Sequence, residues 1–400
     1  MNVLFLTLLS FESIQERTIY TDLLREFVYN GHDVYVISPV EKRQNVKTHM
    51  IKEDHASILR LQIGNTQKTN IIEKGISTVM IEPSFKNAIR KYYGDVRFDL
   101  VLYSTPPITL VSAVEYVKKR DNARTFLLLK DIFPQNAVDL GMMSTSGLKG
   151  ILYKHFRRKE KRLYAVSDNI GCMSQANVDY VVKHNSEVDS SRIFEFPNCI
   201  DIVDKSVNDL TRIQIRNKYG IPNDKKVFVY GGNLGKPQGI EFLVDCLEKC
   251  KDSDAFFLIV GDGTEYSVLE QFINQEKPVN VKLMRRLPKT DYDTMVGACD
   301  VGMIFLDHRF TIPNFPSRLL SYMQAKLPVF AVTDSNTDIG KVIVDNGFGW
   351  WSESNDSEHF KAIVEDILHF DDQNIGQKAY ECLQSRYDVK KVFAEKISLL

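Results

Sequence analysis

Short apolar runs alternate with amphipathic stretches along almost the whole chain, and this alternation restricts the possible folds more than any other feature. Val3–Leu9, Leu100–Ser104 and Thr125–Leu129 are predicted strands, and Gln15–Tyr29 is a predicted helix. Chains that alternate strands and helices form parallel sheets with helices on both faces. Strands covered on both faces are apolar nearly throughout, as these runs are. The sequence therefore predicts an α/β fold of the doubly wound type.

A break in this pattern divides the chain into two similar halves. The alternation pauses at 194–209, and a second series begins after Pro222. Its predicted strands are Val227–Tyr230, Phe256–Val260, Val281–Met284, Val301–Phe305 and Val329–Val332. A chain of 400 residues is long enough for two domains of about 200 residues each. We predict an N-terminal domain over 1–200, a C-terminal domain over 201–385, and a C-terminal helix over 386–400 that can return to the first domain.

Composition and charge exclude several classes of protein. The 51 Lys and Arg residues face 52 Asp and Glu, for a net charge of −1, whereas nucleic-acid-binding proteins need a basic excess. No segment approaches the roughly 18 apolar residues of a membrane span, and Val3–Leu9 fits a buried strand better than a signal peptide. The six cysteines form no CxxC pair and lack further zinc ligands nearby. We therefore expect a cytoplasmic protein with reduced thiols and no metal.

The strongest local motif is a glycine-rich turn that follows the predicted strand Val227–Tyr230. It reads Gly-Gly-Asn-Leu-Gly-Lys from Gly231 to Lys236 and leads into a predicted helix over Gly239–Cys250. Glycines let the backbone approach a phosphate, and a helix N-terminus offers free N–H groups to it. The spacing matches neither the Walker A nor the G-x-G-x-x-G fingerprint, so a phosphate site and a plain tight turn both stay open. The glycine turn at Gly261–Gly263 is a weaker signal of the same kind.

Polar loops follow several other predicted strands, at the edge where open α/β sheets bind ligands. Ser317 or Asn314 can cap the next helix, and Arg318 stands in its first turn, where the helix dipole disfavours a cation. An anionic ligand would offset that cost, and a solvated surface arginine is the alternative. The loops of the N-terminal half at this edge are Ser10–Gln15, Tyr103–Pro107 and Lys130–Asn136.

The predicted helix Leu148–Tyr164 is strongly basic. Its single acid, Glu160, stands against Lys154, Arg157, Arg158, Lys159, Lys161 and Arg162. Such a face can contact anionic lipid headgroups, but a solvated helix face is the interpretation that we favour. The histidines form no H-x-x-x-H or triad pattern, and no G-x-S-x-G elbow exists, so the sequence does not support a hydrolase.

Motifs spread along both halves, taken in order, resemble the retaining glycosyltransferases of family 4, which have the two-domain GT-B fold. The segments that carry the resemblance are Lys130–Gln135, Met173-Ser174, Phe196–Asp201, Tyr230–Gly239, Leu258–Gly263, Leu287-Pro288, Ala298–Val301, Phe315–Met323 and Pro328-Val329. Bacterial transferases of O-antigen and capsule assembly, including fucosamine transferases, form the branch that the chain resembles most.

The resemblance implies transfer of a sugar, with retention, from a UDP-sugar that carries an N-acetylated amino sugar. The implied acceptor is a glycan or a polyprenyl-diphosphate-linked sugar of bacterial surface polysaccharide, which would bring the protein to an anionic membrane surface. The implied donor-binding residues are Gly232, Asn233, Lys236, Asp262, Arg286, Leu287, Pro316, Ser317 and Ser321. The implied acceptor-binding residues are Ser13, Glu16, Arg17 and Thr105, and the implied catalytic residues are Asp131, Lys130 and Arg318. No metal is implied, because protein donors and helix-terminal amides stabilise the leaving diphosphate.

The sequence departs from the family pattern where many members carry Glu-x7-Glu. Pro313 and Ser321 stand at those two positions, and the second glutamate normally holds the ribose hydroxyls. A histidine that some members use falls at Lys130 or Asp131. Two other hypotheses therefore stay open. One is a non-catalytic GT-B scaffold or partner subunit, which would not bind UDP, and the other is a UDP-sugar 2-epimerase, which would need no acceptor.

Overall fold

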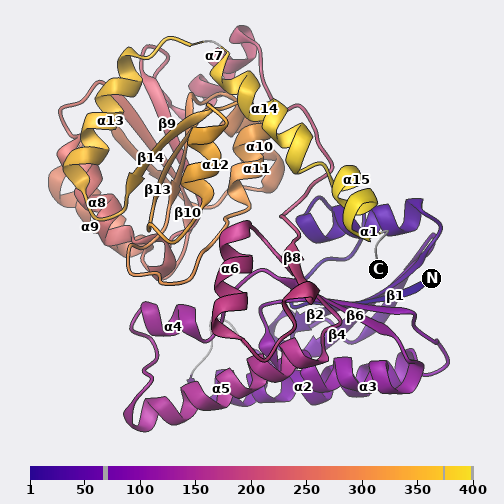
Figure 1. Cartoon of the computed structure of the whole chain (residues 1–400). Helices are drawn as coiled ribbons and strands as arrows, with labels where there is room; N and C mark the ends of the chain where they lie inside the picture. Colours follow the sequence, from indigo (N-terminus) through magenta and orange to yellow (C-terminus); the bar gives the residue numbers. More distant parts are fainter. Residues whose placement is uncertain (66–70, 373, 398–400) are drawn as a thin grey trace. The chain divides into compact units, whose positions relative to one another are not determined.

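The computed structural model describes residues 1–65, 71–372 and 374–397, which form two compact units (Figure 1). Unit 1 comprises Met1–Asp201 together with the segment that starts at Val389, and unit 2 comprises Ile202–Asp388. These divisions lie close to the boundaries expected from the sequence, at residues 200 and 385. The end of the expected C-terminal helix, 398–400, lies outside the described residues.

The centre of unit 1 is a mostly parallel sheet. Its strands are β1 (Asn2–Leu6), β2 (Asp33–Glu41), β3 (His49–Glu53), β4 (Ala56–Ile63), β5 (Leu100–Ser104), β6 (Arg124–Leu129), β7 (Asn169–Cys172) and β8 (Ile193–Glu195). Within the described residues they lie in the order β3-β4-β2-β1-β5-β6-β7-β8, and β3 pairs antiparallel with β4. The central strands β1 and β5 are buried along nearly their whole length, because helices cover both faces.

The helices of unit 1 form a layer on each face of this sheet. They are α1 (Ile19–Tyr29), α2 (Ile71–Tyr92), α3 (Val111–Asp121), α4 (Gln135–Asp139), α5 (Gly147–Val166), α6 (Gln175–His184) and α15 (Val389–Val392). Single turns of other helix types are η1 (Lys42–Gln44), η2 (Ile108–Leu110), η3 (Ser190–Arg192) and the π-helical η5 (Phe393–Ile397). The helices α2, α3 and α5 pack side by side on one face, and α1 lies with α15 on the other (Figure 1).

The first helix begins later than the hydrophobic pattern predicts. It starts at Ile19 rather than Gln15, because Thr18 acts as its N-cap. The Thr18 side chain accepts a hydrogen bond from the backbone N–H of Thr21, and the Thr21 side chain accepts one from the backbone N–H of Thr18. This reciprocal capping box satisfies amides that the first helical turn leaves free.

The end of the chain packs on α1, within unit 1. The Phe393 ring meets the Phe27 ring edge to face, with centroids 4.9 Å apart, and the Val389 backbone N–H donates to the carbonyl of Ile200 at 3.0 Å. The expected C-terminal helix over 386–400 is observed as a helical segment that starts at Val389, where the four-residue α15 continues as the π-helical η5.

The centre of unit 2 is a fully parallel sheet. Its strands are β9 (Lys226–Asn233), β10 (Ala255–Asp262), β11 (Val281–Met284), β12 (Val301–Phe305), β13 (Val329–Thr333) and β14 (Gly349–Glu353). Within the described residues they lie in the order β11-β10-β9-β12-β13-β14, with parallel pairing throughout. The prediction of doubly wound parallel sheets is therefore confirmed for both units.

The helices of unit 2 cover both faces of its sheet. They are α7 (Asp209–Tyr219), α8 (Ile240–Lys249), α9 (Tyr266–Glu276), α10 (Lys289–Gly297), α11 (Arg318–Gln324), α12 (Ile339–Asp345), α13 (Ser357–His369) and α14 (Ile375–Arg386), with the 3-10 turn η4 (Lys236–Gln238). On one face α8, α9 and α13 share an apolar core with the strands that includes Phe257 and Phe360. On the other face Tyr292 of α10 and Tyr322 of α11 reach the strands.

We predict that Phe393→Ala destabilises unit 1. Truncation of a buried phenylalanine typically costs about 3–5 kcal/mol, because it removes apolar contact and leaves a cavity. Urea unfolding, followed by far-UV circular dichroism, measures the effect. Lys391→Ala, a substitution of an exposed neighbour, is the control. Equal midpoints for the two variants would show that the return of the chain end to α1 contributes nothing to stability.

Candidate functional site

A pocket of about 420 Å³ lies where β9, β10 and β11 end at the carboxyl edge of the unit 2 sheet. We call it the β9–β11 pocket. Its lining residues are Gly231, Gly232, Asn233, Val260, Gly261, Asp262, Arg286, Leu287, Lys289, Tyr292 and Arg318. The structure thus brings together six residues that the sequence suggested for donor binding or catalysis, namely Gly232, Asn233, Asp262, Arg286, Leu287 and Arg318.

Two consecutive glycines at the end of β9 open this pocket to side chains from neighbouring helices. A Cβ atom on Gly231 would lie 1.8 Å from the Tyr292 hydroxyl, and one on Gly232 would lie 3.0 Å from Nη2 of Arg318. Gly232 also has a φ of +137°, which side chains other than glycine rarely adopt. The glycines therefore do more than form a turn, because they let Tyr292 and Arg318 approach the strand.

Arg318 is a half-buried cation with incomplete hydrogen bonding. Its guanidinium lies 4.4 Å from the centroid of the Tyr230 ring, in cation–π contact. Its buried Nη1 atom has no hydrogen-bond partner among the described residues, and neither has the hydroxyl of Tyr292. Burial tends to lower the pKa of Arg318, but the Tyr230 and Tyr322 hydroxyls outweigh it and raise the pKa. A buried charged donor without an acceptor is costly, and an anionic ligand would remove that cost.

The opposite wall of the pocket depends on Asp262 at the end of β10. Its carboxylate accepts a hydrogen bond from Nη1 of Arg285 at 3.1 Å and another from the backbone N–H of Arg286 at 3.3 Å. The Arg285 guanidinium also stacks over the Tyr266 ring, 3.4 Å from its centroid. These contacts fix the loop after β11 and leave the exposed side chain of Arg286 beside Leu287 at the pocket.

Four of the proposed donor-binding residues do not line the β9–β11 pocket. Lys236 belongs to the turn η4 and lines a different pocket beside α8. Pro316, Ser317 and Ser321 lie before or on α11, outside the pocket lining. Ser317 occupies the N-cap position of α11, as the sequence suggests, but its side chain makes no capping hydrogen bond.

In unit 1, Thr105 supports the loop that follows β6. Its hydroxyl oxygen accepts hydrogen bonds from the backbone N–H groups of Lys130 at 2.9 Å and Asp131 at 3.2 Å. The residue is only 1% exposed. In the structure its hydroxyl is buried and holds the loop, and the expected contact of Thr105 with an acceptor stays a prediction.

Lys130 and Asp131 point to different partners and have opposite pKa shifts. Burial lowers the pKa of Lys130 to about 8, and its ammonium group donates to the Phe196 carbonyl at 3.3 Å. Burial raises the pKa of Asp131 to about 6, and Nδ2 of Asn136 lies 2.8 Å from each of its carboxylate oxygens. Perturbed pKa values of this kind are common at functional sites, although structural networks also produce them.

The loop after β1 contains the other suggested acceptor-binding residues. Glu16 accepts hydrogen bonds from the backbone N–H groups of Glu12 at 2.7 Å and Ser13 at 3.3 Å. Arg17 forms an exposed ion pair with Asp201 at 3.5 Å. Ser13 and Glu16 therefore stabilise the loop itself, whereas the exposed Arg17 side chain reaches Asp201.

Two buried arginines that the sequence analysis missed hold this loop. Arg60 of β4 donates to the carbonyl of Phe11 at 2.7 Å, and Arg25 of α1 donates to the carbonyl of Glu16 at 3.0 Å while it pairs with Asp22. The available signal is an arginine between two leucines of a mostly apolar strand, at Arg60, since buried cations need specific partners.

The described residues contain no group of three or more His, Cys, Asp or Glu side chains arranged to hold a metal ion. All six cysteines are free and buried. Burial raises the pKa of the Cys172 thiol to about 12. The thiols are therefore packing groups rather than nucleophiles at neutral pH.

The comparisons with known proteins identify the class of this chain. Residues 211–381 match the family described as Glycosyl transferases group 1 and form a domain of that family. Sucrose-phosphate synthase from Thermosynechococcus elongatus has a TM-score of 0.78 at 14% identity, covering 100% of this chain and 98% of that one. HepE from Anabaena, solved in complex with UDP, has a TM-score of 0.70 at 17% identity, covering 100% of both chains. These likenesses establish the GT-B fold.

Two curated relatives carry related names. WbjE from Pseudomonas aeruginosa, named a glycosyltransferase, is 23% identical over 324 residues, which are 80% of this chain and 78% of WbjE. WcaI from Escherichia coli, named a glycosyl transferase of colanic acid biosynthesis, is 22% identical over 248 residues, which are 61% of this chain and 60% of WcaI. The chain therefore contains a Glycosyl transferases group 1 domain over residues 211–381, has the GT-B fold, and is similar over much of its length to proteins named glycosyltransferases.

We predict that Asp131→Asn stabilises the protein at neutral pH. The raised pKa of Asp131 means that the folded state favours its protonated form. The protonated carboxyl therefore contributes to stability below the pKa that Asp131 has in the unfolded chain, and this contribution is lost as the pH rises through about 6. Relative to the wild type, the free energy of unfolding of the variant should be about 2 kcal/mol higher at about pH 8 and little changed at about pH 4. Urea unfolding at both pH values measures this gap. The exposed Asp179→Asn is the control, and a gap independent of pH would contradict the burial of Asp131.

Proposed function

We propose that this chain binds a UDP-sugar in the β9–β11 pocket and transfers the sugar, with retention, to a glycan or a lipid-linked acceptor. The observation that carries the proposal is the unpaired, buried Nη1 atom of Arg318 beside Gly232. A diphosphate supplies the acceptor oxygens that this nitrogen lacks. The complex of HepE with UDP supports a uridine nucleotide as the ligand.

The proposed reaction uses Arg318 to stabilise charge that develops on the leaving diphosphate. Its guanidinium is already fixed against Tyr230, so little reorganisation is needed when the glycosidic bond to the phosphate breaks. The neutral hydroxyl of Tyr292 can donate a second hydrogen bond, because burial raises its pKa well above the ordinary value. Arg286 and Leu287 would flank the base. In the proposed mechanism these groups, rather than a metal ion, stabilise the negative charge of the diphosphate.

In a retaining transfer on one face of the sugar, the leaving phosphate oxygen can accept the proton of the attacking acceptor hydroxyl. The protein then needs no pair of carboxylates of the kind that glycosidases use. We propose that Asp131 orients the acceptor or stabilises positive charge on the sugar ring, because its pKa of about 6 leaves it ionised at neutral pH. Lys130, with a pKa of about 8, would act beside it as a cation.

We further propose an acceptor that belongs to a bacterial surface polysaccharide and is presented at a membrane. The name of WcaI, which refers to colanic acid biosynthesis, supports this substrate class. An N-acetylated amino sugar is the proposed donor sugar. A screen of UDP-, GDP- and dTDP-sugars against a lipid-linked acceptor tests both parts. Transfer from a GDP- or dTDP-sugar alone would contradict the nucleotide.

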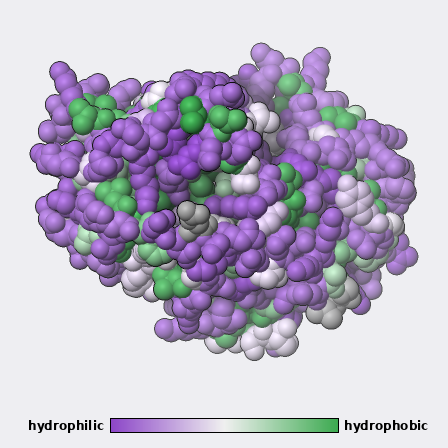
Figure 2. All heavy atoms as spheres, turned by 90° about the horizontal axis from the view of Figure 1, so that it is seen from above, coloured by the Kyte–Doolittle hydropathy of each residue, from purple (hydrophilic) through white to green (hydrophobic). Residues whose placement is uncertain are grey.

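We propose that contact with a membrane surface is electrostatic and local. Within the described residues no helix has both the length and the apolar character required to cross a bilayer. On the face shown in Figure 2, hydrophobic residues form small separate patches in a hydrophilic surface. Most cations of α5 that the structure describes are paired, since Arg157, Lys159, Lys161 and Arg162 contact Glu160, Glu82, Glu187 and Glu115. Among the ion pairs of the described residues, none uses the exposed Lys154 or Arg158.

We predict that Arg318→Ala weakens UDP binding strongly. The loss of a charge-assisted hydrogen bond in a partly buried site should reduce affinity about tenfold or more and lower sugar transfer at least as much. Calorimetry with UDP and with the UDP-sugar measures binding, and product formation measures transfer. Arg386→Ala, an exposed arginine of α14, is the control for loss of a cation. Wild-type affinity and transfer in Arg318→Ala would remove Arg318 from the site.

The same measurements separate the two alternative functions. A scaffold subunit would bind no UDP at millimolar concentration even in the wild-type protein. An epimerase would interconvert a UDP-sugar without any acceptor, and NMR of donor plus protein would show the new sugar signals. Transfer to an added acceptor with an unchanged donor pool contradicts both alternatives.

We predict that reversing the charges of Lys154 and Arg158 on α5 weakens binding to anionic vesicles. Each cation near an anionic surface contributes about 1 kcal/mol, so Lys154→Glu with Arg158→Glu should reduce binding at least about tenfold. Flotation with phosphatidylglycerol vesicles at low and high salt measures it. Charge reversal at the exposed Lys183 and Lys391 is the control. An equal loss in both double variants would show that α5 has no special role.

A further inference from the structure

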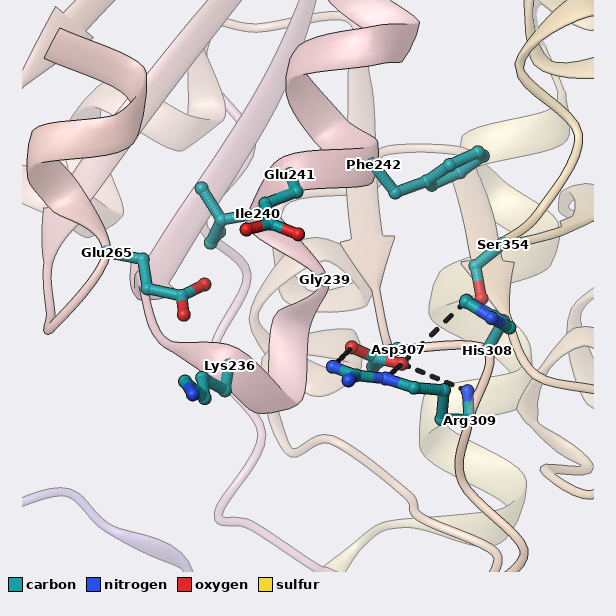
Figure 3. A pocket seen from close by; sticks show the side chains of 10 residues that line it. All are labelled: Lys236, Gly239, Ile240, Glu241, Phe242, Glu265, Asp307, His308, Arg309 and Ser354. Carbon is teal, nitrogen blue, oxygen red and sulfur yellow. Dashed lines mark hydrogen bonds and ion pairs between the residues drawn. The ribbon is translucent and has the colours of Figure 1, made fainter. Parts of the chain in front are cut away.

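A second polar pocket in unit 2 has no place in the proposed donor site. It lies at the N-terminus of α8, shares no lining residue with the β9–β11 pocket, and has a volume of about 270 Å³ (Figure 3). Its walls come from the turn η4, the start of α8, the ends of β12 and β14, and the residue before α9. We call it the α8 pocket. It is too small for a nucleotide, since ligand pockets for larger molecules usually exceed about 300 Å³.

The α8 pocket contains an unsatisfied buried hydroxyl. Ser354 is 1% exposed, and its Oγ atom has no hydrogen-bond partner among the described residues. In Figure 3 this hydroxyl points into the pocket, toward His308. A buried hydroxyl without a partner costs free energy in the ligand-free protein, so a polar ligand that reaches Ser354 would recover it.

The backbone adds donors from a second direction. The helix α8 has ten residues, its N-cap Gly239 adopts the left-handed conformation, and no side chain caps it. The first helical backbone hydrogen bond runs from Leu243 to the Gly239 carbonyl. The amides of Ile240, Glu241 and Phe242 precede that bond, and all three residues line the pocket.

The charges around the pocket exclude a simple ion as its ligand. The Asp307 carboxylate is already held by Arg309, through Nε at 2.9 Å, Nη2 at 2.6 Å and the backbone N–H at 3.0 Å. Among the other charged side chains of the lining, Glu241 and Glu265 would repel an anion. The exposed Lys236 would repel a cation. Burial and the charge of Glu241 raise the pKa of Glu265. This site offers both donors and acceptors but little net charge.

Neutral polyols match such a lining, because each hydroxyl both donates and accepts hydrogen bonds. Carboxylates of Glu241 and Glu265 can accept from sugar hydroxyls, while Ser354 and the α8 amides can donate to them. The partly buried ring of Phe242 offers an apolar surface for the C–H face of a pyranose. We propose that the α8 pocket binds one neutral pyranose unit of a glycan, at a site separate from the β9–β11 pocket.

Saturation-transfer NMR of the full chain with a panel of methyl pyranosides tests this inference. The probes are the methyl glycosides of glucose, galactose, mannose, N-acetylglucosamine and fucose, each titrated in the presence of saturating UDP. At least one should bind saturably. Ser354→Ala and Glu241→Ala should each weaken that affinity about fivefold to tenfold, the effect of one lost hydrogen bond. UDP affinity should not change in either variant.

Glu248→Ala is the matched control, since it removes an exposed glutamate from the same helix outside the pocket. The melting temperature of ligand-free Ser354→Ala should equal or exceed that of the wild type, because the substitution removes an unsatisfied hydroxyl. A decrease would mean that Ser354 has a structural partner and would overturn the inference.

Several further results would overturn it. These are the absence of saturable binding by any glycoside, displacement of the glycoside by inorganic phosphate, or unchanged glycoside affinity in both Ser354→Ala and Glu241→Ala. Loss of glycoside binding in Arg318→Ala alone would instead place the sugar in the β9–β11 pocket. Failure of UDP binding leaves the glycoside titration interpretable, so this inference and the proposed function fail separately.

Discussion

The contact of Arg318 with the end of β9 organises the carboxyl edge of unit 2. Its guanidinium reaches past Gly232 to the Tyr230 ring because Gly231 and Gly232, near the end of the strand, have no side chains. The Tyr322 hydroxyl, one turn further along α11, accepts a hydrogen bond from the Gly231 backbone N–H at 3.3 Å and lies 3.0 Å from the Met303 carbonyl oxygen. Strand ends and helix are thereby fixed before any ligand arrives, and the unpaired nitrogen of Arg318 is held in place for an anion.

The strands at the buried centre of each sheet could be predicted from the sequence, whereas most edge strands could not. Strands β5 and β12 have the predicted bounds, because helices on both faces require continuous apolar runs. The edge strand β11 has the predicted bounds as well. The strands that the pattern missed, β3, β8 and β14, are all at an edge of their sheets. Edge strands are partly exposed, and β3 and β14 contain polar or half-exposed residues at most positions. Their pairing depends on tertiary neighbours rather than on their own hydrophobicity.

Sequence order identified the loops of the candidate site but not the directions of their side chains. Gly232 and Lys236 stand four residues apart, yet they line different pockets, because the turn η4 carries Lys236 to the α8 side. Thr105 was placed at the right edge, but its hydroxyl turns inward to the backbone of Asp131. The role of Arg60 depends on contact with Phe11, 49 residues earlier in the chain, which no local pattern contains.

The absence of the usual glutamates changes how this site must select its ligand. Pro313 and Ser321 replace them, so α11 contributes a cation, Arg318, without a nearby acid of its own. Asp262 is the acid at the pocket, and Arg285 with the backbone N–H of Arg286 already engages it. The net charge of the side chains that line the pocket is therefore positive, although the net charge of the whole chain is −1. In the proposed function, recognition of the nucleoside depends on the loop after β11, whose position is set by Asp262 rather than by a glutamate on α11.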